Sequence, residues 1–284
     1  MPELAYVNGS YCELAEARVS IEDRGFQFAD GVYEVLVAYG SRIIGLDAHL
    51  ARLERSLEGI GLVFDVRAHR IEEMIVEGIA RAGFERTIAY LQITRGVAPR
   101  AHAWPANMTP TVVATFKAKP QIDPELRRRG LSVLTMPDTR WSRCYIKSIA
   151  LLANVLAKDE ARRGGYDEAV FVGPGGEVRE ATTANIFLVT DGTLVSPPKS
   201  DAILHGVTRG FVLECAAKIA LPHREAEVVE ADLFAAQELF LSSTTVDFIG
   251  VTRVNDRNVG NGRVGPITRA LFEQFQRSVA QAAG

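Results

Sequence analysis

The stretch Tyr145-Ile146-Lys147-Ser148 lies near the middle of the chain, directly before an apolar run from Ile149 to Ala157. We expect a helix from Ser148 to Arg163, ending at Gly164-Gly165, so Lys147 would lie at its N-terminus. A cation there opposes the helix dipole, and the apolar neighbours favour partial burial. Both effects lower the pKa of a lysine and make its amine nucleophilic, although a solvated surface lysine would also fit this pattern.

Composition indicates a soluble globular protein. The 284 residues are 47% hydrophobic and 24% charged, and the formal charge is -3. This balance disfavours disorder and a nucleic-acid binder with a strongly basic surface. Cys12, Cys144 and Cys215 are far apart and form no CxxC pair, so we expect neither a metal site nor a disulfide framework. No signal peptide or membrane-spanning segment is apparent, and we expect a cytoplasmic protein with no membrane partner.

The pattern of elements predicts an α+β fold in two domains. We expect a small N-terminal α/β domain over residues 1–118, a linker over 119–122 that contains Pro120, and a larger C-terminal domain over 123–284. The first domain has alternating or apolar runs typical of strands and Leu-rich spacing typical of helices. The expected strands are 33–39, 42–44, 87–94 and 111–116, and the expected helices are 46–57 and 66–82.

The C-terminal domain also mixes strands and helices. Its expected strands are 168–172, 184–189, 239–241 and 246–251, and its further helices are 207–220 and the segment that begins at Pro266. The run Gly260-Asn261-Gly262-Arg263-Val264-Gly265 spells GxGxxG, but the chain ends before a dinucleotide-binding unit could be completed. We therefore interpret this run as a turn leading into a helix.

Several further residues could form a site, although each has a simple structural explanation of its own. Glu180, 33 residues after Lys147, is a turn carboxylate or the partner of a cationic ring nitrogen. Gly206-Val207-Thr208 opens a helix, where backbone N–H groups and a hydroxyl can bind an anion. Ser242-Ser243-Thr244-Thr245 offers four hydroxyls after a strand, and the two segments together predict a phosphate cup.

Arg52 and the loop that carries Arg100 also allow a structural and a functional interpretation. Arg52 lies on the flank of a Leu-rich helix, where it either extends to water or reaches a phosphate as a planar fork. Arg100 and His102 lie in a long loop over residues 95–110, in which Pro99 restricts the backbone. This loop is either mobile and solvated or aimed at a small carboxylate.

A nucleophilic lysine, a carboxylate and two phosphate-binding segments are what pyridoxal 5'-phosphate requires. The sequence resembles the class IV (fold type IV) aminotransferases along nearly its whole length. The matching segments are Glu22 to Glu34, His49-Leu50-Ala51-Arg52-Leu53, Tyr145 to Ser148, Glu180 to Phe187, Gly206 to Arg209 and Ser243-Thr244-Thr245. The resemblance implies a two-domain pyridoxal phosphate fold with a mixed, barrel-like sheet in the larger domain.

The resemblance also implies roles for individual residues. Lys147 would hold the cofactor covalently and act as the catalytic base, and Glu180 would keep the ring nitrogen protonated. Leu204 would pack against the ring. The remaining cofactor-binding residues implied by the matching motifs are Arg52, Thr183, Gly206, Val207, Thr208, Ser243 and Thr244.

Within this family, the loop Thr94 to His102 is most similar to that of the D-amino-acid aminotransferases. There, Arg100 and His102 would bind the substrate carboxylate with Tyr33, reaching across a homodimer interface into the partner's active site. The substrates would be a D-amino acid such as D-alanine and a 2-oxo acid such as 2-oxoglutarate. The alternatives are 4-amino-4-deoxychorismate lyase, branched-chain L-amino-acid or (R)-amine aminotransferases, and a non-catalytic pyridoxal phosphate carrier.

Overall fold

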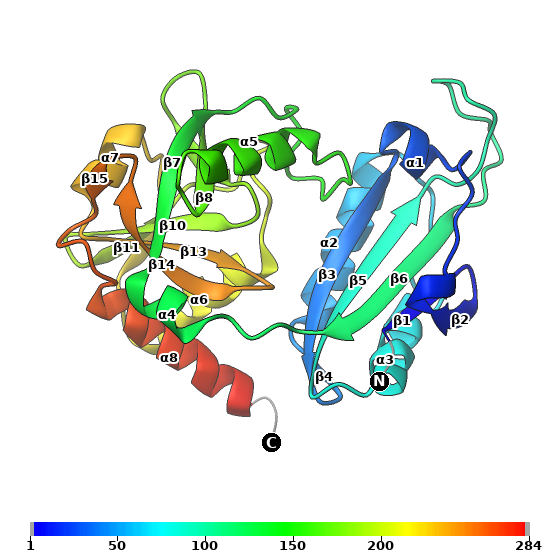
Figure 1. Cartoon of the computed structure of the whole chain (residues 1–284), viewed down its shortest axis with the longest axis horizontal. Coiled ribbons are helices and arrows are strands. Elements are labelled where there is room, and N and C mark those ends of the chain that lie inside the picture. The colour runs from blue at the N-terminus through cyan, green and yellow to red at the C-terminus, as the bar shows by residue number, and fades with distance from the viewer. Residues whose placement is uncertain (1–2, 282–284) are drawn as a thin grey trace. The chain divides into compact units, whose positions relative to one another are not determined.

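The computed structural model describes residues 3–281. The chain divides into two compact units. The first contains the chain up to Pro120 together with Ile146–Ala150, and the second contains Gln121–Tyr145 and the chain from Leu151 onward. The short segment Ile146–Ala150, which carries Lys147, is therefore part of the first unit although it lies far along the sequence (Figure 1).

The first unit is an antiparallel six-stranded sheet with helices. The strand order is β2-β1-β6-β5-β3-β4. The strands are β1 (Leu4–Val7), β2 (Ser10–Glu13), β3 (Gly31–Tyr39), β4 (Arg42–Ile43), β5 (Arg86–Thr94) and β6 (Thr111–Ala118). The helical elements are the 3-10 turn η1 (Leu14–Glu16) and helices α1 (Arg24–Phe28), α2 (Leu46–Gly59) and α3 (Ile71–Ala82).

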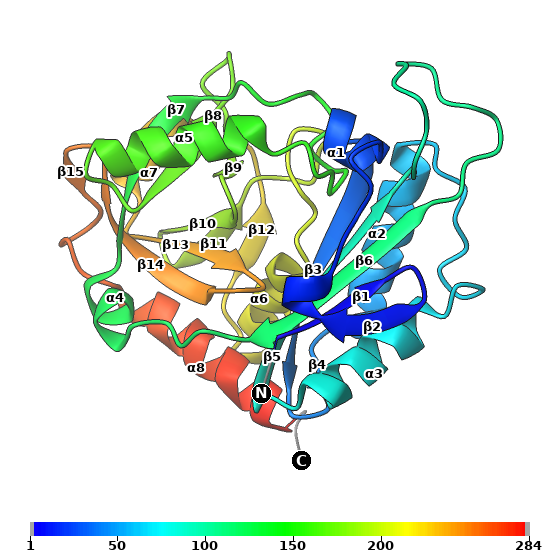
Figure 2. The same ribbon diagram turned by 45° about the vertical axis from the view of Figure 1, so that its right-hand side comes forward.

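The long central strands are covered by two amphipathic helices. Strand β3 pairs with β5 from Gly31 opposite Thr94 to Tyr39 opposite Arg86. Helix α2 packs against β3, and α3 packs against β1, β5 and β6 (Figure 2). The apolar stripe of α2 buries Leu53 and Leu57, as its spacing of three and four residues requires.

The second unit is built on a mixed nine-stranded sheet. The order is β12-β11-β10-β13-β14-β7-β8-β9, with β15 beside β14. The strands are β7 (Leu131–Pro137), β8 (Glu168–Val172), β9 (Val178–Ala181), β10 (Asn185–Thr190), β11 (Thr193–Ser196), β12 (His223–Glu225), β13 (Glu238–Ser243), β14 (Asp247–Val254) and β15 (Arg257–Asn258). The helices are α4 (Pro124–Arg129), α5 (Leu152–Arg163), α6 (Val207–Lys218), α7 (Glu230–Ala235) and α8 (Pro266–Gln281).

Both faces of the central strands in this sheet are buried. Along β10, Ile186 and Leu188 join one apolar cluster, whereas Phe187 and Val189 join another. The second cluster includes residues of α6 and α8, which pack against each other and cover that face. A strand buried on both sides is a nearly continuous apolar run, which is why 184–189 was recognisable from the sequence.

The α+β fold and most of the expected elements are confirmed, but two predicted helices begin too early. Helix α3 starts at Ile71 rather than at residue 66, after a series of turns. Helix α5 starts at Leu152, so Lys147 does not lie at a helix N-terminus, and the argument from the helix dipole was wrong. The segment before α5 instead forms a bridge between Ser148 and Val32 of β3, which competes with helix formation there.

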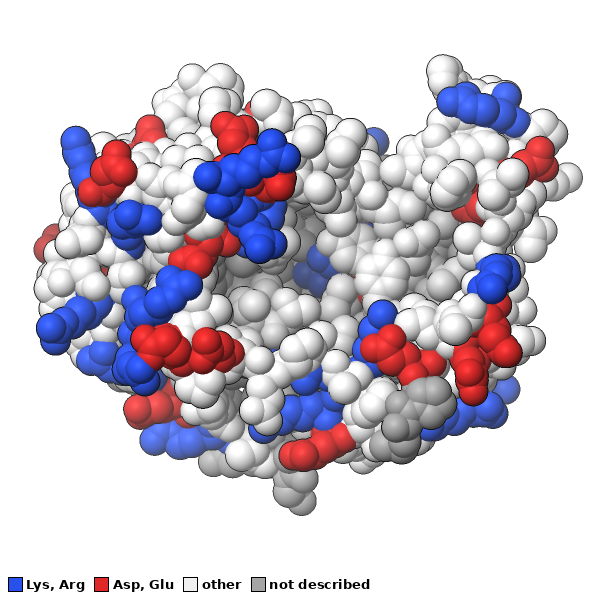
Figure 3. All heavy atoms as spheres, in the orientation of Figure 1, with Lys and Arg blue, Asp and Glu red and all other residues white. Residues whose placement is uncertain are grey.

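In the described part of the chain, no helix combines the length and the apolar character needed to cross a membrane. On the face shown in Figure 3, Lys and Arg side chains are interspersed with Asp and Glu side chains.

Gly78 and Gly210 provide a matched test of how closely helix α3 packs on strand β6. A Cβ added to Gly78 in α3 would lie 2.1 Å from Cζ of the fully buried Phe116, whereas one added to Gly210 in α6 would meet nothing within 4 Å. Gly78→Ala should lower the free energy of unfolding by about 1–2 kcal/mol, because overpacking outweighs the better helix propensity of Ala. Gly210→Ala should raise it by about 0.5–1 kcal/mol. Chemical denaturation checks both, and stabilisation by Gly78→Ala would contradict the close packing of α3 on β6.

Candidate active site

Lys147 and Tyr33 lie together in the first unit. The backbone N–H of Tyr33 donates to the Lys147 carbonyl at 2.9 Å, so the lysine segment pairs with β3. The Lys147 N–H in turn donates to Ser56 Oγ of α2 at 3.2 Å. The half-buried Lys147 side chain places Nζ 4.2 Å from the centroid of the Tyr33 ring. An amine that lies over an aromatic ring is attracted by the ring face and held in a defined place.

Below this pair, α2 is fixed to β3 by buried charges. The Glu34 carboxylate accepts hydrogen bonds from Arg52 Nε and Nη2, both at 2.7 Å, and from His49 Nδ1 at 2.8 Å. All three side chains are almost fully buried. Glu34 neighbours Tyr33 in β3, so this bidentate pair fixes the position of the strand that carries the ring under Lys147.

The protonation states of Glu34 and His49 depend on burial and on the charges and hydrogen bonds around them. Burial alone would raise the pKa of Glu34, but the charge and hydrogen bonds of Arg52 and His49 lower it from 4.5 to about 2. Burial lowers the pKa of His49, and the positive charges of Arg52 and Lys147 lower it further, against the opposing effect of Glu34. At neutral pH Glu34 is therefore an ionised carboxylate, and His49 is a neutral imidazole that donates from Nδ1.

In the second unit, Glu180 is held by donors from three elements. Its Oε1 accepts from Arg140 Nη1 at 2.6 Å and from the Leu204 backbone N–H at 3.0 Å, while Oε2 accepts from Asn185 Nδ2 at 3.1 Å. Asn185 Nδ2 also donates to the Leu204 carbonyl at 2.9 Å. The carboxylate is buried and its orientation is fixed, as a group that binds a cationic nitrogen requires.

Arg140 is itself fixed by a second carboxylate. Asp138 accepts from Arg140 Nε at 3.0 Å and Nη2 at 2.9 Å, and from Arg179 Nη1 at 2.9 Å. Burial would raise the pKa of Asp138, but the two arginines lower it overall. The Arg140 guanidinium lies 4.4 Å from the centroid of the Phe171 ring, so it is enclosed by charge and by an aromatic face.

The two segments expected to bind phosphate meet through Asn185. Gly206 is the N-cap of α6 and provides no side-chain hydrogen bond to the helix. A Cβ added there would lie 2.0 Å from Asn185 Oδ1, so glycine is required by this close approach. Asn185 pairs with Ser242 in the ladder between β10 and β13. The first-turn N–H groups of α6 have no acceptor within the helix. Asn185 thus contacts the N-cap of this helix and pairs with the hydroxyl-rich end of β13.

This arrangement suits an anion such as a phosphate. The buried Ser242 Oγ has no hydrogen-bond partner among the described residues, and Ser243 Oγ lies 3.3 Å from Thr245 Oγ1. Thr208 lies in the first turn of α6 and is buried, and Thr244 lies in the turn after β13. A helix N-terminus without a side-chain cap and several nearby hydroxyls form the donor set that phosphate oxygens require.

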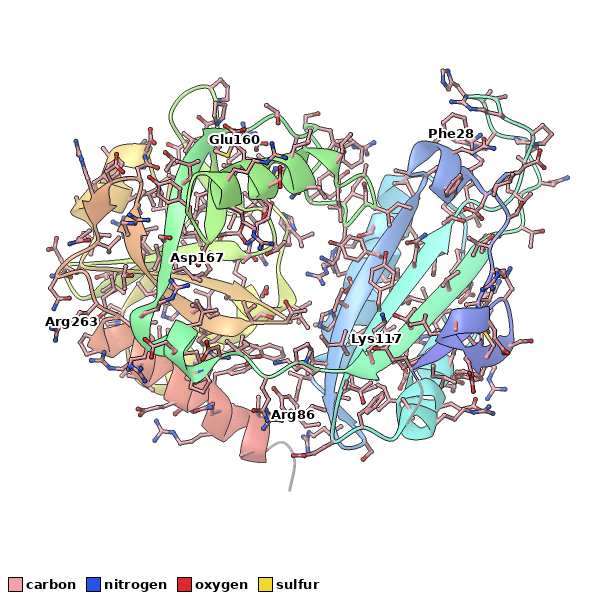
Figure 4. The ribbon with its side chains drawn as sticks, viewed as in Figure 1. Phe28, Arg86, Lys117, Glu160, Asp167 and Arg263 are labelled. Carbon is pink, nitrogen blue, oxygen red and sulfur yellow. The ribbon has the colours of Figure 1, made fainter. Side chains whose placement is uncertain are left out.

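The remaining expected site residues each contact a neighbouring side chain. Arg52 donates hydrogen bonds to Glu34 and lies within hydrogen-bonding distance of His49, so it is buried rather than extended to water. Thr183 Oγ1 donates to Glu168 Oε2 at 3.2 Å. Arg100 and His102 lie at the Phe28 ring, which Figure 4 labels at the end of α1.

Sequence reasoning did not assign roles to Glu34, His49, Asp138, Arg140 and Asn185 individually. Glu34 offered one signal, since a carboxylate inside an otherwise apolar strand must find a buried partner. Asn185 begins a buried strand and could have been singled out for the same reason. Asp138 and Arg140 lie in a loop, where no periodic pattern marks a residue as buried.

Comparison with known proteins identifies the family of this chain. Residues 31–254 match the family model described as "Amino-transferase class IV". The chain belongs to the class IV aminotransferases. A D-alanine aminotransferase of Listeria monocytogenes is 37% identical to this class IV chain over 98% of its length and 96% of the relative's.

Solved class IV structures show the same fold. The branched-chain amino acid aminotransferase of Escherichia coli superimposes with a TM-score of 0.90 at 22% identity, covering 98% of this chain and 94% of that one. The branched-chain aminotransferase of the archaeon Thermoproteus uzoniensis, solved with norvaline, gives a TM-score of 0.88 at 26% identity, with coverage of 98% and 95%.

The Glu34–Arg52 pair predicts a pH-dependent contribution to stability. Because the pKa of Glu34 falls from 4.5 to about 2 on folding, this contribution is complete above pH 4.5 and is lost as the pH falls through 2. Glu34→Gln should therefore lower the free energy of unfolding by roughly 3 kcal/mol at pH 7, leaving Arg52 buried without its counter-ion. Urea denaturation at a series of pH values measures the difference.

The matched control is Glu73→Gln, which removes an exposed carboxylate that pairs with the exposed Arg70. It should change stability by less than about 0.5 kcal/mol at every pH. An equal, pH-independent loss in both variants would contradict the ion pair as the source of the effect.

Proposed function

We propose that this class IV aminotransferase transfers the amino group of a D-amino acid, such as D-alanine, to a 2-oxo acid, such as 2-oxoglutarate. The proposal is supported by the D-alanine aminotransferase relatives, which align with almost the whole chain at 34–37% identity. It is also supported by the Arg100 and His102 loop, whose cationic side chain suits a carboxylate. The observation that carries the chemistry is the Lys147 amine, held over Tyr33 in a network of ordered contacts.

The cofactor of this reaction is pyridoxal 5'-phosphate. When bound, it accepts the amino group and delocalises the electron pair left when the Cα–H bond of the donor breaks. The residues present fit this group: the glycine-capped end of α6 and the unpartnered Ser242 hydroxyl suit its phosphate, and the oriented Glu180 carboxylate suits its ring nitrogen. The amino group is stored on the enzyme between two half-reactions, so the kinetics would be ping-pong.

The chain's own residues have separate catalytic and cofactor-binding roles in this proposal. Lys147 would anchor the cofactor covalently through Nζ. Once the donor amine has replaced Nζ and released it, Nζ would remove the proton from the donor Cα and return it during transfer. Glu180 would keep the ring nitrogen protonated, and Leu204 would pack against the ring. The residues proposed to bind the phosphate and the surrounding cofactor atoms are Arg52, Thr183, Gly206, Val207, Thr208, Ser243 and Thr244.

Arg100, His102 and Tyr33 bind the substrate carboxylate in this proposal. Among the described residues, neither the Arg100 guanidinium nor the His102 ring takes part in an ion pair or hydrogen bond, and both side chains are exposed. Their donors are therefore available to a carboxylate.

The active species would be a homodimer in which the loop over residues 95–110 serves the partner's site. Helix α5 supports this association, because Leu152, Val155 and Leu156 recur at helical spacing on one side and are 70%, 59% and 60% exposed. Such a contiguous apolar face is unfavourable in water and is suited to a subunit interface. A cytoplasmic location and two folding domains, 1–118 and 123–284, complete the proposal, and the free Cys12, Cys144 and Cys215 suit a reducing compartment.

A branched-chain L-amino-acid aminotransferase is the second candidate, because the structural neighbours include such enzymes. 4-Amino-4-deoxychorismate lyase and (R)-amine aminotransferases remain further alternatives. All would retain Lys147 and Glu180, so these two residues do not distinguish them, whereas the Arg100 and His102 loop favours the D-amino-acid enzyme.

The first test compares the two enantiomers of alanine. With 2-oxoglutarate, the purified holoenzyme should form pyruvate from D-alanine with a kcat/KM at least about 100-fold higher than from L-alanine. L-Leucine provides the comparison with the branched-chain candidate. A preference for L-leucine, or pyruvate released from 4-amino-4-deoxychorismate alone, would contradict the D-amino-acid assignment.

Lys147→Ala provides the mechanistic control in the same assay. It should reduce transfer by about 10³-fold or more, since it removes the catalytic base. Lys117→Ala, at an exposed lysine that pairs with Glu3, should leave transfer unchanged.

The homodimer is tested by placing charge on α5. Leu152→Lys with Leu156→Lys should shift the protein from dimer to monomer in size-exclusion chromatography with light scattering, because a buried lysine lacks a counter-ion. Val63→Lys, at a position 97% exposed, is the matched control and should leave the mass unchanged. A dimer that survives the α5 double variant would place the interface elsewhere.

A further inference from the structure

The side chain of Arg24 connects α1 with the loop over residues 95–110. Its Nε donates to Asp30 Oδ2 at 2.8 Å, while Nη1 donates to the Ala101 carbonyl at 2.6 Å and Nη2 to the His102 carbonyl at 3.1 Å. The side chain is 4% exposed. A planar guanidinium that donates hydrogen bonds to two consecutive carbonyls fixes the direction of the peptide unit between them.

Phe28, at the other end of α1, provides the surface on which the loop side chains rest. The Arg24 Cζ lies 4.8 Å from the centroid of the Phe28 ring, and the Arg100 Cζ lies 4.7 Å from it. The His102 ring meets the same ring edge-on, with 5.7 Å between centroids. The two side chains proposed to bind the substrate carboxylate therefore share one aromatic platform, which Figure 4 shows beside the loop.

The base of the loop is anchored separately. Arg95 Nε donates to Asp30 Oδ2 at 2.9 Å, and its Nη2 and Nη1 donate to the carbonyls of Ile60 and Gly61 at 2.8 and 3.3 Å. The Arg24 backbone N–H also donates to the Gly96 carbonyl at 2.9 Å. Removing only the Arg24 side chain would thus free the tip of the loop while its base stays attached.

The charges of this cluster favour an anion. Arg24, Arg95 and Arg100 provide three positive charges, and Asp30 is the acidic residue that pairs with the first two. Two of these cations, Arg24 and Arg100, lie at the same Phe28 ring, with Cζ 4.8 and 4.7 Å from its centroid. A bound carboxylate would relieve this excess, which makes the cluster suited to the substrate rather than to a purely structural contact.

We propose that Arg24 and Phe28 are positioning residues that set the carboxylate selectivity of the enzyme, by holding Arg100 and His102 in the geometry that binds the substrate carboxylate. This inference rests on the proposed function. Neither residue touches the reacting atoms. They act by removing the conformational freedom of the loop tip before the substrate arrives, so that binding the carboxylate does not have to order the loop.

The test measures binding of propionate, a carboxylate that matches D-alanine but has no amine to transfer. In the holoenzyme, Arg24→Met should weaken propionate binding, measured by calorimetry, roughly 10- to 100-fold. It should raise the KM for D-alanine by a similar factor and leave kcat within about twofold. The half-reaction with (R)-2-aminobutane, which has no carboxylate, should keep its wild-type rate in single-turnover absorbance measurements.

Two further variants complete the set. Arg86→Met is the matched control, because Arg86 also lies over an aromatic ring, Tyr39, at 5.8 Å in the same unit, and it should behave as wild type. Phe28→Leu keeps the apolar volume but removes the ring, and should reproduce the selective loss even where Arg24→Met fails to fold.

The outcomes separate the inference from the proposed function. Wild-type propionate binding by both Arg24→Met and Phe28→Leu would overturn the inference, and so would an equal loss with propionate and (R)-2-aminobutane. If the wild-type enzyme does not use D-alanine, the proposed function fails, yet the propionate comparison still tests whether Arg24 and Phe28 support carboxylate binding.

Discussion

The ion pair between Glu34 and Arg52 is the interaction on which the first unit's part of the site depends. It joins β3 to α2 through two parallel hydrogen bonds in a place that water does not reach. Tyr33 precedes Glu34 in the strand, and its backbone pairs with the lysine segment. If the pair were lost, β3 would no longer be fixed to α2, and the positions of Tyr33 and of the segment that carries Lys147 would change together.

The second unit applies the same principle to a different carboxylate. Glu180 is oriented by Arg140, and Arg140 is fixed in turn by Asp138. Neutral donors, the Leu204 N–H and the Asn185 amide, supply the remaining contacts. An arrangement of this kind holds a carboxylate in one orientation without further reorganisation during a reaction.

The family and most of the fold were predictable because their signals are local. Apolar spacing of three and four residues marked α2, and alternation marked β3 and β5. The motifs around Lys147, Glu180 and Gly206 are short and contiguous. The helix expected from Ser148 failed because an apolar sequence is compatible with both a helix and a buried extended segment. Pairing of Ser148 with Val32 decided between them, and that contact joins residues more than a hundred positions apart.

The sequence by itself therefore determined the residue types of the site, the order of its motifs and the class of fold. Tertiary structure alone decided which polar groups meet. Arg52 binds Glu34, Asn185 lies against Gly206, and Arg24 reaches the carbonyls of the loop. The physical reason is that periodicity reports only whether a face is buried. The partner of a buried charge is set by strand register and helix packing, which bring together residues that no local pattern connects.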